Sequence, residues 1–367
     1  MTWTLLFFGF TVALFLLPLA PALLEWRNRR DAQPLKVVRD YDGNIKHFAI
    51  RFRQFLSQQF AELAHDSGPA PVARVGRLPT GDQYELVGAD GLPNIADEER
   101  AQQDVHHMVL GTADLRLGSD MLYEKEVFAA GAIISGGGNS FRALLAKGDI
   151  MLGPDSDVLR WAHSDGSISA GAKCRLFGRI SADRALLLRG ETRFGRMRAP
   201  TIRWGDTQPP PLPQPAARTP LERPRELLDE SAGRWLAPGD WVLPDASYHR
   251  GDLVARGAMA VGAGSLIEGS IKSHGELRLE AGTRITGAVV CSERIWIGPG
   301  CVIGGPLICE RSIEIGAGTV LGTPDTETTV TAEEIRVHEG VIAHGTVWAR
   351  ELGFVIPAVA TTTGASA

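Results

Sequence analysis

Glycine recurs at an interval of 18 residues between Gly251 and Gly318, and this period limits the fold more than any other feature of the sequence. One series is Gly264, Gly282, Gly300 and Gly318, and a second is Gly251, Gly269, Gly287 and Gly305. A straight strand of that length would extend about 60 Å, so the chain has to bend within each repeat. Glycine suits such bends because it adopts positive φ and allows close backbone approach. An internal repeat of this kind predicts stacked, similar units.

A second period of six divides each repeat into three parts. The positions at this spacing are apolar or small: Val261, Ile267, Ser273, Leu279, Ile285, Cys291, Ile297, Ile303, Cys309, Ile315 and Leu321. We therefore expect a three-sided parallel β-helix, an all-β solenoid with about 18 residues per coil and about 4.8 Å between coils. Ile297 should then lie inside, between Leu279 and Ile315. A set of flat β-hairpins is the alternative, but it predicts irregular turn spacing and no period of six.

Charged residues on the outer positions fit the same register. Glu276 would lie beside Arg294 and Glu293 beside Arg311, each pair one coil apart. Opposite charges on neighbouring strands stabilise a sheet by about 0.2–1 kcal/mol per pair.

Composition narrows the functional classes. The 367 residues carry a net charge of −5, which argues against a general nucleic-acid binder. Four cysteines at these spacings do not form a disulfide framework. Cys291 and Cys309 share one coil position and should stack as interior thiols, although a pair this close could be oxidised. A reducing compartment is the simpler interpretation.

The first 24 residues carry no charged side chain and are expected to form a transmembrane anchor over 1–24. A cleaved signal peptide is the alternative, since Ala20-Pro21-Ala22 resembles a cleavage site, but no basic residue precedes the apolar run. Arg27, Arg29 and Arg30 follow it. Basic residues after a span favour the cytoplasmic side, so we expect a single-pass protein of the bacterial inner membrane with its solenoid in the cytoplasm.

Residues 25–68 predict a basic juxtamembrane amphipathic helix. Phe48, Phe52 and Phe55 recur at helical spacing, with basic residues among the polar positions. Together with Arg27, Arg29 and Arg30 they are candidates for contact with membrane lipid. The alternative is a helix packed against the end of the solenoid or against a second copy.

The remaining chain divides into five parts. We expect a connector with one strand at 69–111, a first, irregular solenoid segment at 112–205, a Pro-rich linker with a short helix at 206–240, a regular second segment at 241–351, and an apolar end with a disordered tail at 352–367. In the first segment apolar pairs step by 18, 17, 18, 18 and 16 residues from Leu115 to Ile202. After Gly322 the period lengthens to 22, so Thr323–Thr329 should protrude from a corner.

The apolar end supplies the candidates for self-assembly: Leu352, Phe354, Val355 and Ile356. They follow the last coil, where a solenoid exposes unpaired backbone groups. They should cap their own column or dock on a neighbouring molecule, and the expected partners are further copies, membrane lipid and unidentified envelope proteins, with no nucleic acid.

The sequence contains no P-loop, dinucleotide fingerprint, nucleophile elbow or zinc spacing, so we expect no cofactor, no metal and no catalytic residue. The alternative is a left-handed β-helix enzyme of the acyltransferase type, for which His274 is the best general base. Asp149, Asp155, Asp157 and Asp165 are the nearest approach to a carboxylate cluster, but acidic residues at turns are common turn formers.

The second segment resembles the bactofilins, a family of bacterial polymer-forming cytoskeletal proteins. Their pattern of I-x-G-x-I, a small residue, then L-x-I-x-x-G is matched by Ile267–Ser273 with Leu277–Gly282, and again one and two coils later. The resemblance covers about 241–350 and is weak over 112–205. It implies a right-handed β-helix that polymerises without nucleotide, and hence a membrane-anchored scaffold that organises envelope or polysaccharide-assembly machinery. The anchor, the amphipathic helix and the first segment depart from a minimal bactofilin.

Overall fold

The computed structural model describes residues 44–60, 74–206, 217–222, 230–231 and 234–358, with residues 2, 3, 6–8, 10, 11 and 17 near the start. The chain forms two compact units, Met1–Asn44 and Ile45–Ala367. The second unit is an all-β parallel solenoid of about 13 turns with about 18 residues per coil, as expected from the glycine period. Most of the predicted linker and the tail beyond residue 358 lie outside the described residues.

The structure contradicts the prediction of a transmembrane helix over 1–24. Among the described residues no helix combines the length and the apolar character that a membrane span requires. Among the described residues of the second unit, the helices α3 (His47–Gln59) and α5 (Asp97–Gln102) have 13 and 6 residues, whereas a span takes about 20. Most of 1–24 lies outside the described residues.

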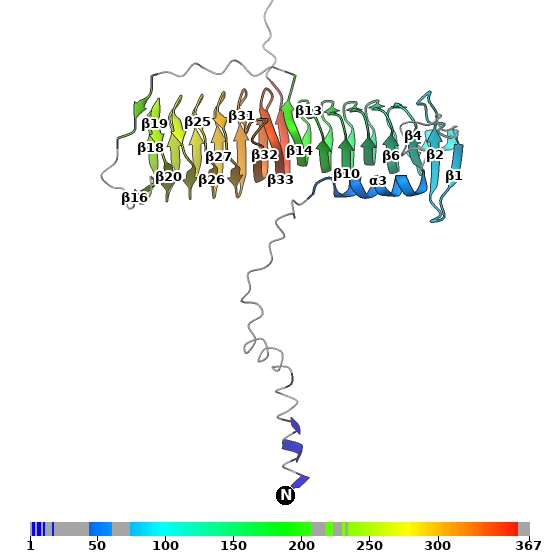
Figure 1. Ribbon diagram of the computed structural model, residues 1–367, viewed down its shortest axis with the longest axis horizontal. Helices are drawn as coiled ribbons and strands as arrows, with labels where there is room; N and C mark the ends of the chain where they lie inside the picture. The colour runs from blue at the N-terminus through cyan, green and yellow to red at the C-terminus, as the bar shows by residue number, and fades with distance from the viewer. Residues whose placement is uncertain are drawn as a thin grey trace, which may run out of the picture. The chain divides into compact units, whose positions relative to one another are not determined.

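The first segment of the solenoid runs from residue 74 to 204 (Figure 1). Each of its regular coils has one long strand, which turns a corner at a shift of register, and one short strand. The strands are β1 (Arg74–Arg77), β2 (Gln83–Val87), β3 (Asp104–Val105), β4 (Met108–Gly111), β5 (Leu115–Leu117), β6 (Leu122–Ala129), β7 (Ile133–Ser135), β8 (Ser140–Ala146), β9 (Ile150–Leu152), β10 (Asp157–Ser164), β11 (Ile168–Ala170), β12 (Arg175–Ala182), β13 (Ala185–Leu188) and β14 (Arg193–Trp204). The parallel ladder begins at β2, inside the stretch predicted as a connector.

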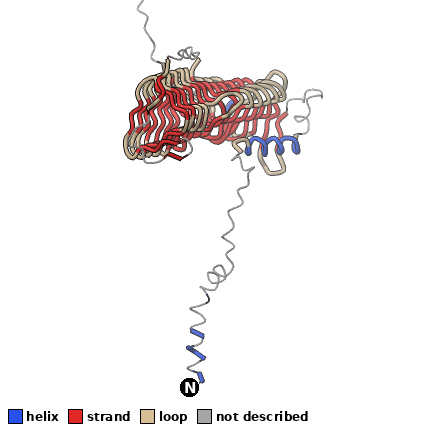
Figure 2. Tube along the Cα trace, turned by 60° about the vertical axis from the view of Figure 1, so that its left-hand side comes forward, coloured by secondary structure: helices blue, strands red, loops and turns tan. Residues whose placement is uncertain are grey.

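The second segment runs from residue 234 to 356 with three short strands per coil until its last turns. Its strands are β17 (Arg234–Ala237), β18 (Trp241–Leu243), β19 (Ser247–Arg250), β20 (Asp252–Ala255), β21 (Met259–Val261), β22 (Leu266–Glu268), β23 (Ile271–Ser273), β24 (Leu277–Leu279), β25 (Arg284–Ile285), β26 (Val289–Cys291), β27 (Arg294–Ile297), β28 (Val302–Ile303), β29 (Leu307–Cys309), β30 (Ser312–Ile315), β31 (Val320–Leu321), β32 (Thr328–His338) and β33 (Ile342–Ile356). Two short strands, β15 (Thr219–Pro220) and β16 (Glu230–Ser231), pair with β19 and β17. Figure 2 shows the stacked strands as red layers.

The predicted register is confirmed in both segments. Ile297 lies between Leu279 and Ile315 and is fully buried. Cys291 and Cys309 are direct neighbours inside the solenoid. In the first segment the pairs from Leu115 to Ile202 follow the predicted steps, and the long step of 22 residues places Ile313 beside Ile335. The outer pairs also form, with 3.9 Å between Arg294 and Glu276 and 3.2 Å between Arg311 and Glu293.

The two glycine series serve different purposes. Gly282 has a φ of +70°, which side chains other than glycine rarely adopt, and its equivalents one coil away are similar. Gly287 has no such φ, but a Cβ there would lie 2.6 Å from the carbonyl carbon of Gly269 in the previous coil. Gly264, Gly282, Gly300 and Gly318 therefore provide left-handed corners, whereas Gly269, Gly287 and Gly305 allow the corners of successive coils to approach closely.

The two segments meet at their last coils. β14 pairs with β33 in antiparallel register, so the coils at which both segments end are joined by backbone hydrogen bonds. In Figure 1 the green β14 lies beside the red-orange β33. Further bonds cross the join from Gly340 N–H to the Trp204 carbonyl (2.6 Å) and from Val355 N–H to the Thr192 carbonyl (3.0 Å). The solenoid is therefore built as two segments stacked with their C-terminal ends together.

Candidate functional site

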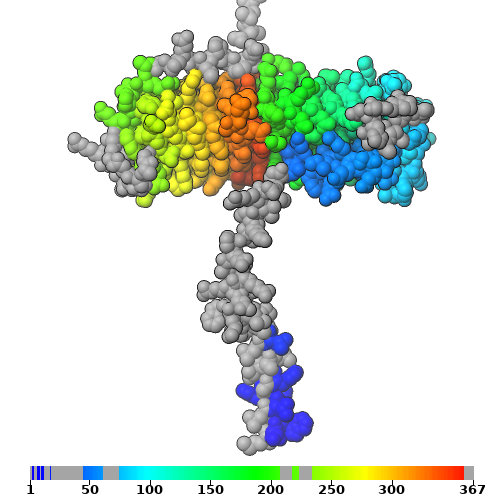
Figure 3. Space-filling model, viewed as in Figure 1, coloured from blue at the N-terminus to red at the C-terminus, as the bar shows by residue number. Residues whose placement is uncertain are grey.

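Helix α3 packs along the side of the first segment, over strands β2, β4, β6, β8 and β10 (Figure 3). The outward side chains of these strands are apolar where the helix covers them. Leu110, Phe128 and Leu145 are neighbours in register and are buried, although they point away from the solenoid interior. Ala49, Leu56 and Phe60 pack on them from α3 or just beyond its end. The helix therefore belongs to the fold of the first segment.

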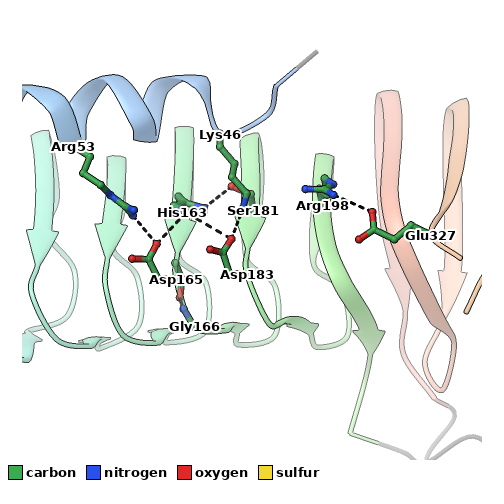
Figure 4. Close-up of polar contacts among 10 residues, drawn as sticks. Lys46, Arg53, His163, Asp165, Gly166, Ser181, Asp183, Arg198 and Glu327 are labelled. Atoms are coloured by element: carbon green, nitrogen blue, oxygen red, sulfur yellow. Dashed lines mark hydrogen bonds and ion pairs between the residues drawn. The ribbon is translucent and has the colours of Figure 1, made fainter. Parts of the chain in front are cut away.

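The same outward columns become polar near the start of α3. His163 follows Leu145 in register, and Ser181 and Arg198 follow His163. Figure 4 shows this row with the two basic side chains that reach it from α3. Arg53 pairs with Asp165 at 2.6 Å, and Lys46 pairs with Asp183. The outward positions thus change from apolar to polar where Lys46 and Arg53 pair with carboxylates of the solenoid.

His163 is buried between the two carboxylates. Its Nδ1 lies 2.9 Å from the hydroxyl oxygen of Ser181, and its Nε2 lies 3.3 Å from Asp165 Oδ1 and 4.0 Å from Asp183 Oδ1. Burial alone would raise the pKa of the Asp165 carboxyl, but hydrogen bonds from His163 and Arg53 outweigh it and hold that pKa below its usual value. Potential ligand atoms of these three residues lie within 4.8 Å of one another, a spacing that could hold a metal ion. Because Lys46 and Arg53 already neutralise the same carboxylates, the group works as an electrostatic clamp on α3.

Two arginines lie in a neighbouring outward row, in which Arg179 follows Trp161 and Arg196 follows Arg179. Arg179 lies over the ring of Phe48 at 5.0 Å, and Arg196 lies over the ring of Trp348 at 5.1 Å. Arg179 and Arg196 are register partners on β12 and β14, and Arg196 faces Trp348 across the join of the segments. We name the outward surface formed by Phe48, Arg179, Arg196, Trp348 and Ile308 the aromatic-arginine patch.

The predicted assembly residues lie at the join of the two segments. Phe354 is the register partner of Arg193, and Val355 is fully buried. Leu352 and Ile356 lie on β33 as well, paired with β32. The segment 352–356 therefore forms part of the last coil and binds the other segment of the same chain. Nearby, Arg198 pairs with Glu327 at 3.0 Å across the join.

The residues predicted to contact lipid lie in two different environments. Phe52 and Phe55 lie half-buried against the solenoid, with the ring centre of Phe52 5.8 Å from that of Trp161. Phe48 remains exposed. Arg27, Arg29 and Arg30 lie outside the described residues. Helix α3 therefore packs on the solenoid, as the alternative prediction had it, but along the side of the solenoid and not at its end.

The residues considered for catalysis are not gathered in one place. His274 is exposed at a turn. Asp149 accepts a hydrogen bond from the Ser167 N–H, and Asp157 pairs with Arg175. Asp155 has a φ of +57° in a turn. Of the four aspartates, Asp165 alone belongs to the clamp described above.

Sequence reasoning missed a polar network at the opposite end of the first segment. Glu85 points inward in the first coil, where the next coils have Val109 and Val127. His107 lies between two carboxylates, with Nε2 3.3 Å from Glu85 and Nδ1 3.1 Å from Glu99 on α5. The hydrogen bond to Glu85 is the main cause that raises the pKa of His107. The adjacent histidines at 106 and 107 were visible in the sequence, but the inward register of Glu85 was not.

No protein-family model matches the chain, and neither the curated proteins nor the solved structures contain a match.

Proposed function

We propose that this protein is a non-catalytic scaffold that associates end to end through its β-solenoid. The join of β14 and β33 carries this proposal, because there the ends of two solenoid segments pair through their backbones. The resemblance of the second segment to the polymer-forming bactofilins supports it as well. A solenoid fold is consistent with such a scaffold because its terminal coils offer strand edges for pairing.

The edge that we assign to association is β18, in the first coil of the second segment. The other two sides of that coil are covered, since β16 pairs with β17 and β15 pairs with β19. Among the described residues β18 has one strand partner, β21. Val242, at the centre of β18, is 74% exposed. A second copy of β18, arriving antiparallel, would satisfy the open edge and give a two-fold dimer.

Light scattering and electron microscopy of the full-length protein, without nucleotide, test this proposal. We expect the mass to rise with concentration to at least that of a dimer. Val242→Lys should weaken the association, because a charged side chain at an edge opposes strand pairing. Met151→Lys is the matched control, since Met151 is also exposed but lies on β9, which has a strand on each side. A monomer at all concentrations up to tens of micromolar would contradict the scaffold proposal.

A further inference from the structure

Three side chains of the types that bind metal ions meet on the outer surface of the first segment, near its first coil. Strands β3 and β6 are parallel neighbours, in which Val105 pairs with Tyr123, and both of these side chains are fully buried. Because side chains alternate along a strand, Asp104 and His106 flank Val105 on the outer face. Glu124, 18 residues after His106, lies beside it on the next coil.

The donor atoms of these three residues are close enough to share one ion. His106 Nδ1 lies 2.8 Å from Glu124 Oε2 and 3.8 Å from Asp104 Oδ1. All three atoms lie within 4.8 Å of one another. Ligands bound to zinc at about 2.0–2.2 Å are separated from one another by about 3–3.5 Å. Small rotations of these partly exposed side chains would therefore place all three atoms around one centre.

One of the three donor atoms lacks a hydrogen bond. Asp104 Oδ1 is buried, and among the described residues no group donates to it. His106 Nδ1, at 3.8 Å, is too far away to do so. A buried carboxylate oxygen without a donor costs free energy. Such atoms are rare in native proteins, and an ion is one of the partners that satisfy them.

Neither lysine nor arginine neutralises the two carboxylates. Within the described ranges, the imidazole of His106 is the one basic group in an ion pair with Asp104 or Glu124. The clamp on α3 has the same combination of one imidazole and two carboxylates, but there Arg53 and Lys46 supply the positive charge. The negative charge of the outer group is therefore available to a cation, whereas that of the clamp is not.

Neighbouring groups hold two of the ligands in place. Glu99 Oε1 accepts a hydrogen bond from the backbone N–H of His106 at 3.3 Å. Arg142 Nη1 donates to the backbone carbonyl of Glu124 at 3.4 Å. In the described part of the chain β3 has one strand partner, β6. An ion shared by the three residues would therefore tie this edge strand to the next coil.

We propose that Asp104, His106 and Glu124 bind a divalent transition-metal ion, with Zn²⁺ as the ion that fits the ligands best. One imidazole nitrogen and two carboxylate oxygens suit Zn²⁺, with water completing its coordination. Ca²⁺ and Mg²⁺ prefer oxygen ligands alone. The ion would stabilise the end of the first segment by linking β3 to β6. This inference is independent of end-to-end association, because β18 belongs to the other segment.

The spacing of the ligands explains why the sequence contains no familiar zinc motif. Asp104 and His106 are two residues apart, and the third ligand comes from the next coil. A solenoid brings such residues together through its register, so the signal emerges only once β3 and β6 are paired.

Calorimetric titration of the untagged full-length protein with Zn²⁺, at about pH 7.5, tests the site. Asp104→Asn, His106→Gln and Glu124→Gln should each lower the affinity by about 100-fold or more, since loss of even an outer-shell partner costs about 10–100-fold. The matched control is His338→Gln, because His338 contacts a single carboxylate, Glu314 at 3.5 Å. This control should bind Zn²⁺ as the wild type does, and millimolar Ca²⁺ or Mg²⁺ should not compete. Circular dichroism checks that each variant is folded.

Two further measurements locate the ion. X-ray absorption of the Zn²⁺-loaded protein should show one imidazole nitrogen with oxygen ligands, all at about 2.0–2.2 Å from the metal. In hydrogen exchange, Zn²⁺ at about 100 times its Kd should raise the protection factors of the β3 and β6 amides by up to about 100-fold over those of protein in a chelating buffer. The protection factors of β18 and β21, in the other segment, should not change.

Four outcomes would overturn the assignment. Affinity that stays unchanged in all three ligand variants would show an adventitious ion only. Loss of binding in His163→Gln, with binding retained in His106→Gln, would place the ion in the clamp. Sulfur ligands at about 2.3 Å would place it on the buried cysteines. Binding that leaves the protection of β3 and β6 unchanged would mean that the ion does not stabilise this end of the solenoid.

Discussion

Gly353 on β33 lies directly against the ring of Phe194 on β14, at the join of the two segments. A Cβ on Gly353 would come within 2.2 Å of two carbons of that ring. Phe194 is buried and has Trp204 as an aromatic neighbour at 6.1 Å, so its ring has little room to move. The join therefore depends on the absence of a side chain at one position.

Gly353→Ala should destabilise the join by about 1–3 kcal/mol, the usual cost of overpacking a filled core. Hydrogen exchange in β14 and β33 should increase, while exchange in β6 and β8 stays unchanged. Gly118→Ala is the control, because a Cβ there meets no atom within 4 Å. Equal effects of the two substitutions would show that the close approach at Phe194 has no energetic weight.

Ile297→Asp should cost several kcal/mol, because it buries an unpaired carboxylate between Leu279 and Ile315. Ile308→Asp is the matched change at an exposed position and should cost much less. Chemical denaturation followed by circular dichroism measures both. Wild-type stability of Ile297→Asp would mean that the interior column is assigned wrongly.

Much of the solenoid is predictable because its signal is local and repeated. The period of 18 and the beat of six determine which side chains point inward, so the sequence alone places Ile297, Cys291 and Cys309 correctly. The step of 22 likewise places Ile335 beside Ile313. A repeat specifies neighbours one coil apart because each coil contacts only the next.

Contacts between distant parts of the chain carry no such signal. Nothing periodic links β14 to β33, so the end segment 352–356 could not be assigned to the first segment from its sequence. The apolar face of α3 was visible, but it suits a lipid surface and a protein groove equally. The deciding feature is that Leu110, Phe128 and Leu145 are outward-facing and apolar, and this emerges only once their strands are in register.

The packing of α3 gives a third prediction. Leu145→Asp should release the helix, because Leu145 is buried in the cluster beneath it and a carboxylate there would lack a partner. Exchange should rise throughout α3, and trypsin should cut after Arg51 and Arg53. Arg53→Gln removes only one ion pair of the clamp, with a half-exposed arginine, and should loosen the helix by less than about 1 kcal/mol. Release by Arg53→Gln but not by Leu145→Asp would assign the docking energy to charge.

The network around His107 should make the end of the first segment sensitive to alkaline pH. Because Glu85 and Glu99 raise the pKa of His107 above 6.5, its contribution is complete below pH 6.5 and is lost as pH rises through the raised pKa. Asp104, His106 and Glu124 are the other titratable groups nearby, and His106 pairs with Glu124 at 2.8 Å. The protection factor of the α5 amides, which compares their exchange rate with the intrinsic rate at the same pH, should therefore fall from about pH 6 to about pH 9.

His107→Gln should abolish that pH dependence and destabilise the end by about 1–3 kcal/mol, since buried Glu85 loses a charged partner. His106→Gln is the control. The pKa of His106 is also raised by its hydrogen bond to Glu124, but its side chain is exposed and the loss should be small. An unchanged alkaline response in His107→Gln would assign it to another group.

His249 should give the opposite response at the other end of the stack. It points inward in the first coil of the second segment, where the next coils have Ile267 and Ile285. Its ring contacts Trp235 at 4.2 Å between centres, and within the described residues its Nε2 has no hydrogen-bond partner. Burial lowers the pKa of His249 below 6.5, so the folded state binds fewer protons than the unfolded chain and stability falls as pH drops below 6.5.

His249→Ile restores the residue that the register favours and removes a buried polar group, which should stabilise the first coil by about 1–3 kcal/mol at about pH 7 and by more at about pH 5. The protection factors of the β17 to β19 amides, each relative to the intrinsic exchange rate at the same pH, measure this effect. The substitution of exposed His274 by Ala is the control. If His249→Ile retains the loss of protection in acid, the acid sensitivity of this end does not come from its buried imidazole.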